Sequence, residues 1–275
     1  MNVAIDDHEL RRFQSVVLRA AGIHLSPQKR ALIMSRLWRR LRDLNLERYG
    51  EYLDRVEHDP DELVEMLDRI ATNETRFFRE QKQFEFLENV VAPRWRRTAE
   101  EGRRHSAVHV WSAACSTGEE PYSVAMCLRA ALGLLWDIRI LATDLSTRAL
   151  AAARAGIWPA EKVAQIPPRF LESFMLRGHG SQSGRIKAGP EIRAMVSFAR
   201  LNLNDADYGI RQRFDLILCR NALMYFDAAS RQCVVERLVD RLLPDGLLFV
   251  GHAETLHGIT TRLRPLLPTI YERAR

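Results

Sequence analysis

No apolar run in this 275-residue sequence approaches the roughly 18 residues that a membrane-spanning helix needs. The first residues, MNVAIDDHEL, also lack the layout of a signal peptide. Cysteine is scarce, and Cys115, Cys127, Cys219 and Cys233 show no CxxC spacing and lie in apolar segments. Reduced thiols in the core are therefore expected, with neither a metal site nor disulfides. These absences predict a cytoplasmic protein that does not insert into a membrane.

Several nucleotide and hydrolase motifs are missing as well. The sequence has no GxGxxG, which disfavours a nicotinamide or flavin dinucleotide, and no GxxxxGK[ST], HExxH or GxSxG. Lysine is also rare, with four residues among 41 basic ones, although the net charge is +6. A basic, arginine-rich chain suits nucleic acid or an acidic protein surface as its partner, and charge alone does not choose between them.

What the sequence does contain is an informative stretch at residues 107–126, AVHVWSAACSTGEEPYSVAM. An apolar run gives way to small residues and then to Glu119-Glu120-Pro121, which opens a helix with apolar periodicity. A strand that turns through small side chains into a helix lets a ligand approach the backbone closely. Phosphate often occupies such a helix N-terminus, but two carboxylates disfavour it here. We therefore expect a ligand with hydroxyls or positive charge, such as S-adenosylmethionine.

Three regions follow from the patterns along the chain. Residues 1–72 predict a helical domain, and residues 73–106 a polar junction followed by a connecting helix. From residue 107 to 275, strands alternate with helices, which favours a doubly wound, mostly parallel sheet of the α/β class. Predicted strands are 108–113, 138–143, 196–203, 214–219 and 247–251, and predicted helices are 119–132, 147–155 and 228–242. The stretch 156–195 breaks the alternation and predicts a small inserted antiparallel β subdomain at about residues 172–198.

Polar residues stand where the predicted strands end, which is where ligands bind in an open α/β sheet. Asp144 ends the second strand, the usual place for an acid that binds ribose hydroxyls. Its alternative is a turn or N-cap role, for which Ser146 is better suited. Asn202 and Leu203 follow the third strand and predict adenine contacts, with a simple turn as the alternative. The segment 220–226, after the fourth strand, is either part of the site or a strand-to-helix connection.

Six segments together resemble the chemotaxis-receptor glutamate methyltransferases of the CheR family: ATNETRFFRE, VWSAACSTGEEPYS, ATDLS, LNL, FDLILCRNALMYFD and LLPDGLLFVGHAETL. The resemblance covers nearly the whole chain. It implies a class I S-adenosylmethionine-dependent methyltransferase fold, with a seven-stranded sheet whose last strand is antiparallel, and an N-terminal all-α domain. It also implies methylation of glutamate side chains in the cytoplasmic signalling helices of chemoreceptors, with S-adenosylhomocysteine as the product.

The resemblance also implies roles for individual residues. The implied cofactor contacts are Asn73, Thr75, Arg79, Ala113, Glu119, Glu120, Asp144, Asn202, Leu203, Asn221 and Ala222. Among them, Glu120 and its neighbour Glu119 would face the amino group of the cofactor. Arg79 and Tyr225 are the implied catalytic residues, because Arg79 would grip a carboxylate and Tyr225 would lie near the reactive methyl group. The inserted subdomain is implied to bind a short peptide at the C-terminus of a receptor.

The clearest helix of the N-terminal region spans residues 28–42. At 100° per residue, one face is apolar and carries Ile33, Met34, Leu37, Trp38 and Leu41. The other face is basic and carries Lys29, Arg36, Arg39 and Arg40. This basic face is either solvated or a docking surface for glutamate-rich receptor helices, for which Arg36, Arg39 and Arg40 are the candidates. Docking of this kind would recruit the protein to membrane-bound receptor arrays.

The proposed chemistry needs little from the protein. A glutamate side chain has a pKa of about 4.3 and is already an anionic nucleophile at neutral pH, so no general base is required. Two alternatives stay open, a nucleic-acid methyltransferase and a cofactor-binding signalling scaffold without turnover. Residues 221–225 lack the paired prolines of an adenine-methylating site, and aromatic residues do not alternate with basic ones, so no nucleic-acid partner is expected. The presence of Asp144, Asn221 and Tyr225 argues against an inactive scaffold.

Overall fold

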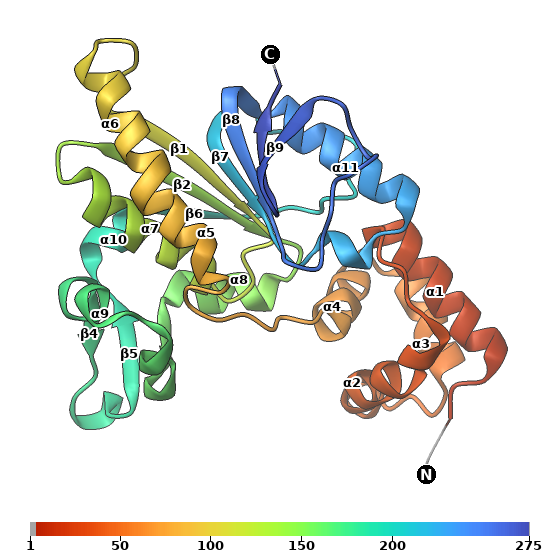
Figure 1. Cartoon of the computed structure of the whole chain (residues 1–275). Helices are drawn as coiled ribbons and strands as arrows, with labels where there is room; N and C mark the ends of the chain where they lie inside the picture. The colour runs from red at the N-terminus through yellow and green to blue at the C-terminus, as the bar shows by residue number, and fades with distance from the viewer. Residues whose placement is uncertain (1–3, 275) are drawn as a thin grey trace.

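The computed structural model describes residues 4–274, and its N-terminal part is all helical (Figure 1). The helices are α1 (Asp7–Ala21), η1 (Pro27–Lys29), α2 (Arg30–Asp43), α3 (Tyr49–His58) and α4 (Pro60–Ile70), and they share one apolar core. Side chains cap two of them, since Asp6 accepts from the Glu9 backbone N–H at 2.7 Å at the start of α1 and Asp59 accepts from the Asp61 N–H at 3.0 Å at the start of α4. The predicted all-α domain is confirmed.

A seven-stranded sheet forms the larger part. Its strands are β1 (Ala107–Ala113), β2 (Asp137–Asp144), β6 (Val196–Arg200), β7 (Phe214–Cys219), β8 (Leu242–Val250), β9 (Leu263–Leu267) and β10 (Ile270–Arg273). They lie in the order β6-β2-β1-β7-β8-β10-β9. The first five in this order are parallel to one another, whereas β10, the last in the chain, is antiparallel to both β8 and β9. The predicted mostly parallel sheet with an antiparallel last strand is confirmed.

Helices cover both faces of the sheet, because alternate strand residues point to opposite sides. The face with Val108 and Val110 packs against α5 (Gln81–Phe86), η2 (Leu87–Val91), α6 (Ala92–Glu100) and α7 (Glu119–Leu132). The face with Trp111 packs against α11 (Ala228–Asp240), and α8 (Thr147–Ala155) contacts β2 and β6. Strand β6 ends at Arg200 instead of at residue 203 as predicted, and a turn follows from residue 203.

Three of the four cysteines, Cys115, Cys127 and Cys219, are buried as predicted, and all four are free thiols. Cys233 is exposed, so the predicted core position is wrong for this residue. The reason is the periodicity of α11, whose buried side chains are Val234, Val235, Leu238 and Val239. Position 233 directly precedes this apolar stripe and turns toward solvent.

The inserted subdomain is a three-stranded antiparallel sheet in the order β3-β5-β4. Its elements are β3 (Ile157–Pro159), η3 (Ala160–Gln165), α9 (Pro168–Phe174), β4 (Met175–Arg177), η4 (Gly180–Gln182) and β5 (Arg185–Ala188), and α10 (Pro190–Ala194) leads back to β6. The predicted range of about 172–198 therefore misses β3 and includes the start of β6. The prediction missed β3 because three residues are too few to give a periodic signal. Trp158 anchors this strand, since its side chain is buried against Phe77 and Tyr122.

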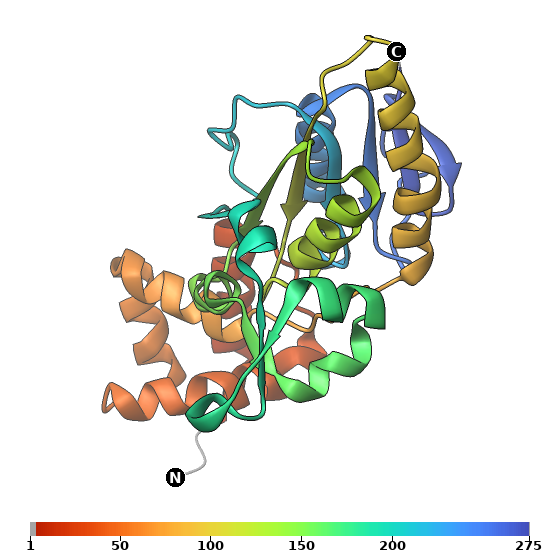
Figure 2. The ribbon, with the colours of Figure 1, turned by 90° about the vertical axis from the view of Figure 1, so that its left-hand side faces the viewer.

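One segment, which we call the strap (residues 71–80), joins α4 to α5. Figures 1 and 2 show the N-terminal helices and the inserted subdomain at the same end of the sheet, with the strap running between them. The helical domain also contacts the sheet region directly, because the backbone N–H of His24 donates to the Tyr225 carbonyl at 2.7 Å. Within residues 4–274, every helix is too short or too polar to span a bilayer.

Candidate functional site

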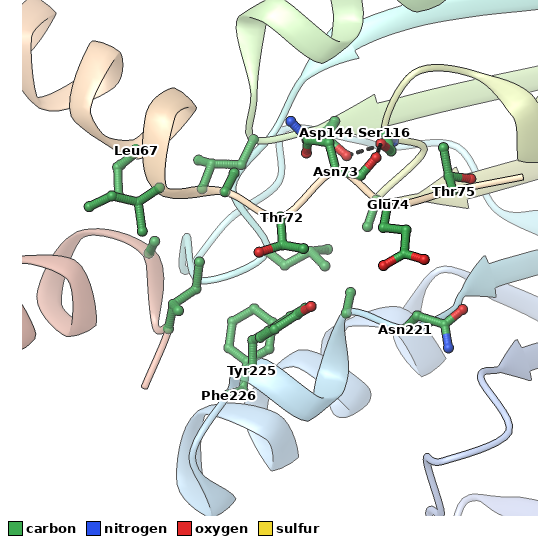
Figure 3. Close-up of a pocket in the computed structure, with 18 of the residues that line it drawn as sticks. Leu67, Thr72, Asn73, Glu74, Thr75, Ser116, Asp144, Asn221, Tyr225 and Phe226 are labelled. Carbon is green, nitrogen blue, oxygen red and sulfur yellow. Dashed lines mark hydrogen bonds between the residues drawn. The ribbon is translucent and has the colours of Figure 1, made fainter. Parts of the chain in front are cut away.

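A pocket lies at the carboxyl edge of the parallel strands, between the sheet, the strap and the ends of α1 and α4 (Figure 3). Ten of the predicted site residues line it: Asn73, Thr75, Arg79, Glu120, Asp144, Asn202, Leu203, Asn221, Ala222 and Tyr225. They come from five separate segments of the chain, which the fold brings together at one edge. Of the predicted contacts, Ala113 and Glu119 do not line the pocket.

The loop after β1 forms a floor of small residues under this pocket. Ala114, Ser116 and Gly118 have positive φ angles of 97°, 49° and 96°, so the chain turns tightly before α7. A side chain at Gly118 would be strained, and its Cβ would lie 3.0 Å from the Cβ of Ala153. Ala113 is buried beneath this turn, and Ala114 and Ser116 line the pocket in its place. The loop presents backbone to the pocket and leaves room for a large ligand.

Asp144 closes one side of this floor. Its two carboxylate oxygens accept hydrogen bonds from the backbone N–H groups of Ser116, at 2.8 Å, and Ser146, at 2.9 Å, and Figure 3 shows the first of these. Burial raises the pKa of Asp144, and these hydrogen bonds offset part of that effect. Ser146 is the N-cap of α8, accepting from Ala149 at 3.1 Å, so Asp144 does not have that role. Each Asp144 oxygen keeps further acceptor capacity for a ligand hydroxyl.

The two adjacent glutamates of α7 have different positions. Glu120 lines the pocket, accepts from the Ser112 hydroxyl at 2.6 Å and lies 3.2 Å from Nη1 of Arg220. Burial raises the pKa of Glu120 despite the opposing effect of Arg220. Glu119 instead points away into the protein, where it is 1% exposed and forms an ion pair with Lys162 at 2.9 Å. Both carboxylates were predicted to face the ligand, and of the two only Glu120 lines the pocket in the described structure.

Arg220 is a pocket residue that the prediction of site residues missed. Its side chain is 2% exposed and contacts the carboxylates of Glu80 and Glu120, each at 3.2 Å, and the carbonyl of Arg79. The signal in the sequence was an arginine directly after the apolar strand FDLILC, because a charge at the end of a buried strand needs partners. Arg220 ties β7, α7 and the strap together behind the pocket.

Glu254 holds the next turn, which carries Asn221 and Tyr225. Its carboxylate is nearly buried and accepts from the backbone N–H groups of Asn221 at 2.8 Å, Gly251 at 2.6 Å and Met224 at 3.2 Å. Asn221 has a positive φ of 58°, a conformation that such a network stabilises. A Cβ at Gly251 would lie 2.4 Å from Nδ2 of Asn221, so glycine is required there.

Two family models match the chain in succession. The CheR methyltransferase all-alpha domain matches residues 8–71, and the CheR methyltransferase SAM binding domain matches residues 73–271. The chain belongs to the CheR methyltransferase family. It is 38% identical to the chemotaxis protein methyltransferase of Escherichia coli over 98% of this chain and 92% of that protein. It is also 34% identical to the chemotaxis protein methyltransferase of Borreliella burgdorferi, over 99% of this chain and 96% of that protein.

This CheR family member is therefore a methyltransferase, and its cofactor is S-adenosylmethionine. The pocket fits such a ligand, because a floor of small residues lies between two carboxylates, Asp144 and Glu120. Apolar side chains at Leu145, Leu201 and Leu203 line the pocket beyond Asp144. The neighbouring Asn202 is partly engaged elsewhere, since its Nδ2 donates to the Ala20 carbonyl at 2.7 Å.

The two predicted catalytic residues of this CheR protein both line the pocket. Tyr225 reaches in from η5 (Leu223–Tyr225), and Figure 3 shows it across the pocket from Thr72 and Glu74 of the strap. Arg79 lies farther along the strap, where its Nη1 donates to the Glu74 carbonyl at 3.1 Å. Both side chains can therefore reach a carboxylate that enters the pocket.

The predicted docking residues of α2 differ from one another in their surroundings. Arg36 donates to the carbonyls of Ile70 and Ala71 at the end of α4, and Arg40 forms a bidentate pair with the buried Glu62. Arg39 is exposed, as is Trp38, which is 47% exposed although the helical pattern predicted it on the buried face. The exposed face of α2 thus offers Trp38 and Arg39, and less of Arg36 and Arg40.

Proposed function

We propose that this enzyme transfers a methyl group from S-adenosylmethionine to glutamate side chains in the cytoplasmic signalling helices of chemoreceptors. The product would be a glutamate methyl ester, as used in sensory adaptation. The observation that carries the proposal is a single pocket in which a small-residue floor and two carboxylates, suited to the cofactor, adjoin Arg79 and Tyr225, suited to an acceptor carboxylate. The relatives named as chemotaxis protein methyltransferases support the same substrate class.

Each pocket residue then has a role toward the cofactor. Asp144 would accept hydrogen bonds from the ribose hydroxyls, and Asn202 and Leu203 would bracket the adenine. Glu120 would face the ammonium group, with Glu119 and Ala113 supporting the same loop from behind. The strap would add Asn73 and Thr75, and Asn221 and Ala222 would line the transfer site.

The reaction needs position more than acid or base catalysis. When bound, S-adenosylmethionine supplies a methyl group on a positively charged sulfur. An acceptor glutamate is anionic at neutral pH, so the two charges neutralise each other during transfer, which a partly dry pocket favours. Arg79 and Tyr225 would orient the carboxylate by hydrogen bonding and hold it in line with the methyl group. A tight ion pair would reduce its nucleophilicity, so Arg79 would aim the carboxylate without activating it.

The same proposal places the enzyme in the cytoplasm, recruited to membrane-bound receptor arrays. Arg39, with Arg36 and Arg40 beside it, would attract acidic receptor helices to α2. A second contact is available at β4, which lies at the edge of its sheet beside β5 in the described structure and to which an extended receptor C-terminal peptide could add. No nucleic acid is part of the proposal.

Labelled methyl transfer tests this function directly. Purified enzyme is incubated with methyl-labelled S-adenosylmethionine and a receptor cytoplasmic fragment, or with RNA of equal mass. We expect label on the receptor alone, released by mild base as a methyl ester is, and lost when the acceptor glutamates are changed to alanine. Label on RNA, or base-stable label on the receptor, would refute the proposal.

Arg79→Ala should lower this transfer roughly tenfold or more, because the acceptor loses an orienting contact. The measurement is the initial rate at saturating cofactor. Arg96→Ala, an exposed position on α6 away from the pocket, is the matched control and should keep the wild-type rate. Turnover by the Arg79 variant at the wild-type rate would remove this residue from the catalytic site.

A further inference from the structure

The inserted subdomain holds the strap through Lys162, a residue of η3. The Nζ of Lys162 lies 2.9 Å from Oε1 of Glu119 and 3.0 Å from the carbonyl oxygen of Thr75. Glu119 is 1% exposed, and its other oxygen accepts from the Thr117 hydroxyl at 2.6 Å. One ammonium group thus joins the first turn of α7 to the backbone of the strap.

Two further hydrogen bonds hold the strap near Lys162, and both are donated by backbone N–H groups of the strap. The Phe77 N–H donates to Oε1 of Gln165 at 3.0 Å, again from η3. The Phe78 N–H donates to the Ser123 hydroxyl at 3.0 Å. Because backbone groups are bonded, these contacts fix where the strap lies along its length, whatever its side chains do.

The strap needs such support, because its conformation is unfavourable by itself. Phe78 and Glu80 have positive φ angles of 48° and 63°, a region that residues with a Cβ rarely adopt. Such conformations persist only where the surroundings impose them. The side chains that the strap sends into the pocket, Asn73, Thr75 and Arg79, depend on this imposed path.

We infer that Lys162 is a positioning residue that fixes the path of the strap. It thereby fixes where the strap side chains that would contact the cofactor enter the pocket. Glu119, predicted from the sequence as a cofactor contact, instead holds the ammonium group of Lys162 in place. The inference rests on the proposed function only in taking the strap side chains as cofactor contacts. Lys162 itself does not line the pocket.

The test is the affinity for S-adenosylhomocysteine, measured by isothermal titration, which needs no acceptor protein. Lys162→Met keeps most of the side-chain volume and removes the charge. We expect affinity to fall roughly tenfold, as for a lost charged hydrogen bond, with a full complement of binding sites. Lys187→Met, on β5 of the same subdomain, removes an equal charge outside the pocket lining and should bind as the wild type does.

A second variant separates positioning from stability, since Lys162→Met leaves the Glu119 carboxylate buried and unpaired. The double variant Lys162→Met/Glu119→Gln removes that charge, and its melting temperature should return toward the wild-type value. If Lys162 positions the strap, affinity stays low in the double variant, because the Thr75 carbonyl still lacks its donor. Wild-type affinity in either variant would overturn the inference. Cofactor binding without receptor methylation by the wild type would instead refute the proposed function and leave this inference standing.

Discussion

Two glutamates, the buried Glu62 and the partly buried Glu120, are each bound to an arginine and differ in a way that separates the two parts of the molecule. Glu62 in the helical domain accepts from Arg40 at 2.9 and 2.5 Å and from the Tyr52 hydroxyl at 2.9 Å. Burial acts to raise its pKa, but these hydrogen bonds outweigh it and the pKa is lowered. Glu120 at the sheet edge shares Arg220 with Glu80, and burial keeps its pKa raised. The first carboxylate is fully paired, whereas the second retains capacity for a ligand cation.

Backbone strain also differs between the pocket and the helical domain. Five of the eight non-glycine residues with positive φ in the described chain lie in the strap or the loops of the pocket: Phe78, Glu80, Ala114, Ser116 and Asn221. Of the remaining three, only Asn45 belongs to the helical domain. Strain that is tolerated at one edge of the sheet marks where the fold has been shaped for binding.

Removing Arg220, which pairs with both Glu80 and Glu120, gives the largest expected effect. Arg220→Met should lower the free energy of unfolding by about 3–5 kcal/mol, because Glu80 and Glu120 lose a buried partner. It should also abolish measurable binding of S-adenosylhomocysteine. Arg40→Met leaves Glu62 buried without its main partner and should destabilise the protein too, yet keep cofactor affinity. Chemical denaturation and isothermal titration measure the two quantities. Equal losses of affinity in both variants would mean that the Arg220–Glu120 pair and the Arg40–Glu62 pair do not differ in their relation to the cofactor.

Removing one aspartate from each part should separate affinity from stability. Asp144→Ala should weaken S-adenosylhomocysteine binding by roughly tenfold to a hundredfold, since two ribose contacts are lost and the N–H groups of Ser116 and Ser146 lose their acceptor. Asp59→Ala removes the N-cap of α4 and should lower the free energy of unfolding by about 1 kcal/mol without changing affinity. Unchanged affinity in the Asp144 variant would exclude it from the cofactor site.

The predicted site residues that line the pocket include those whose places the topology dictates. Asp144, Asn202 and Asn221 each follow a parallel strand, so a parallel sheet brings them to one edge wherever the helices pack. Glu119 was misplaced because its partner, Lys162, lies in an insertion whose path local sequence does not encode. A pattern identifies a loop more reliably than the direction of each side chain within it.

The α2 face shows the same limit. Periodicity separates apolar from basic residues, but it does not say which element covers each face. Here α4 packs beside α2, so its carboxyl end binds Arg36 and its Glu62 binds Arg40, while Trp38 stays exposed. Arginine pairing with a helix that is distant in sequence has no signature in the local pattern.

The opposite pKa shifts of the two glutamates predict opposite pH dependences. The raised pKa of Glu120 gives stability that is present below its ordinary value and lost as pH rises through the raised one. The lowered pKa of Glu62 gives stability that is present above its ordinary value and lost as pH falls through the lowered one. The lowered pKa of Glu62 lies below its ordinary value, so melting curves are needed from about pH 2 to pH 8. They should change in opposite directions in Glu120→Gln and Glu62→Gln, compared with the wild type.

Cofactor affinity sharpens this prediction. Protonation of Glu120 as pH falls through its raised pKa should weaken S-adenosylhomocysteine binding, because a neutral carboxyl no longer attracts an ammonium group. Glu120→Gln should bind more weakly at neutral pH and show a flatter pH profile, whereas Glu62→Gln should keep the wild-type profile. A pH profile that is identical in all three proteins would mean that Glu120 does not face the ammonium group.

The smallest effect is expected at Arg39, the exposed arginine of α2. Arg39→Glu should raise the KM for a receptor fragment by roughly threefold at low salt, because a surface charge steers encounter more than it contributes affinity. The difference from the wild type should shrink as salt screens it. Arg96→Glu on α6 makes the same charge change away from the pocket and should leave the KM unchanged. If both variants behave alike, or if methylation by the wild type is insensitive to salt, the basic face of α2 is only solvated. Its charge would then serve stability through Arg36 and Arg40, as in the rest of the helical domain.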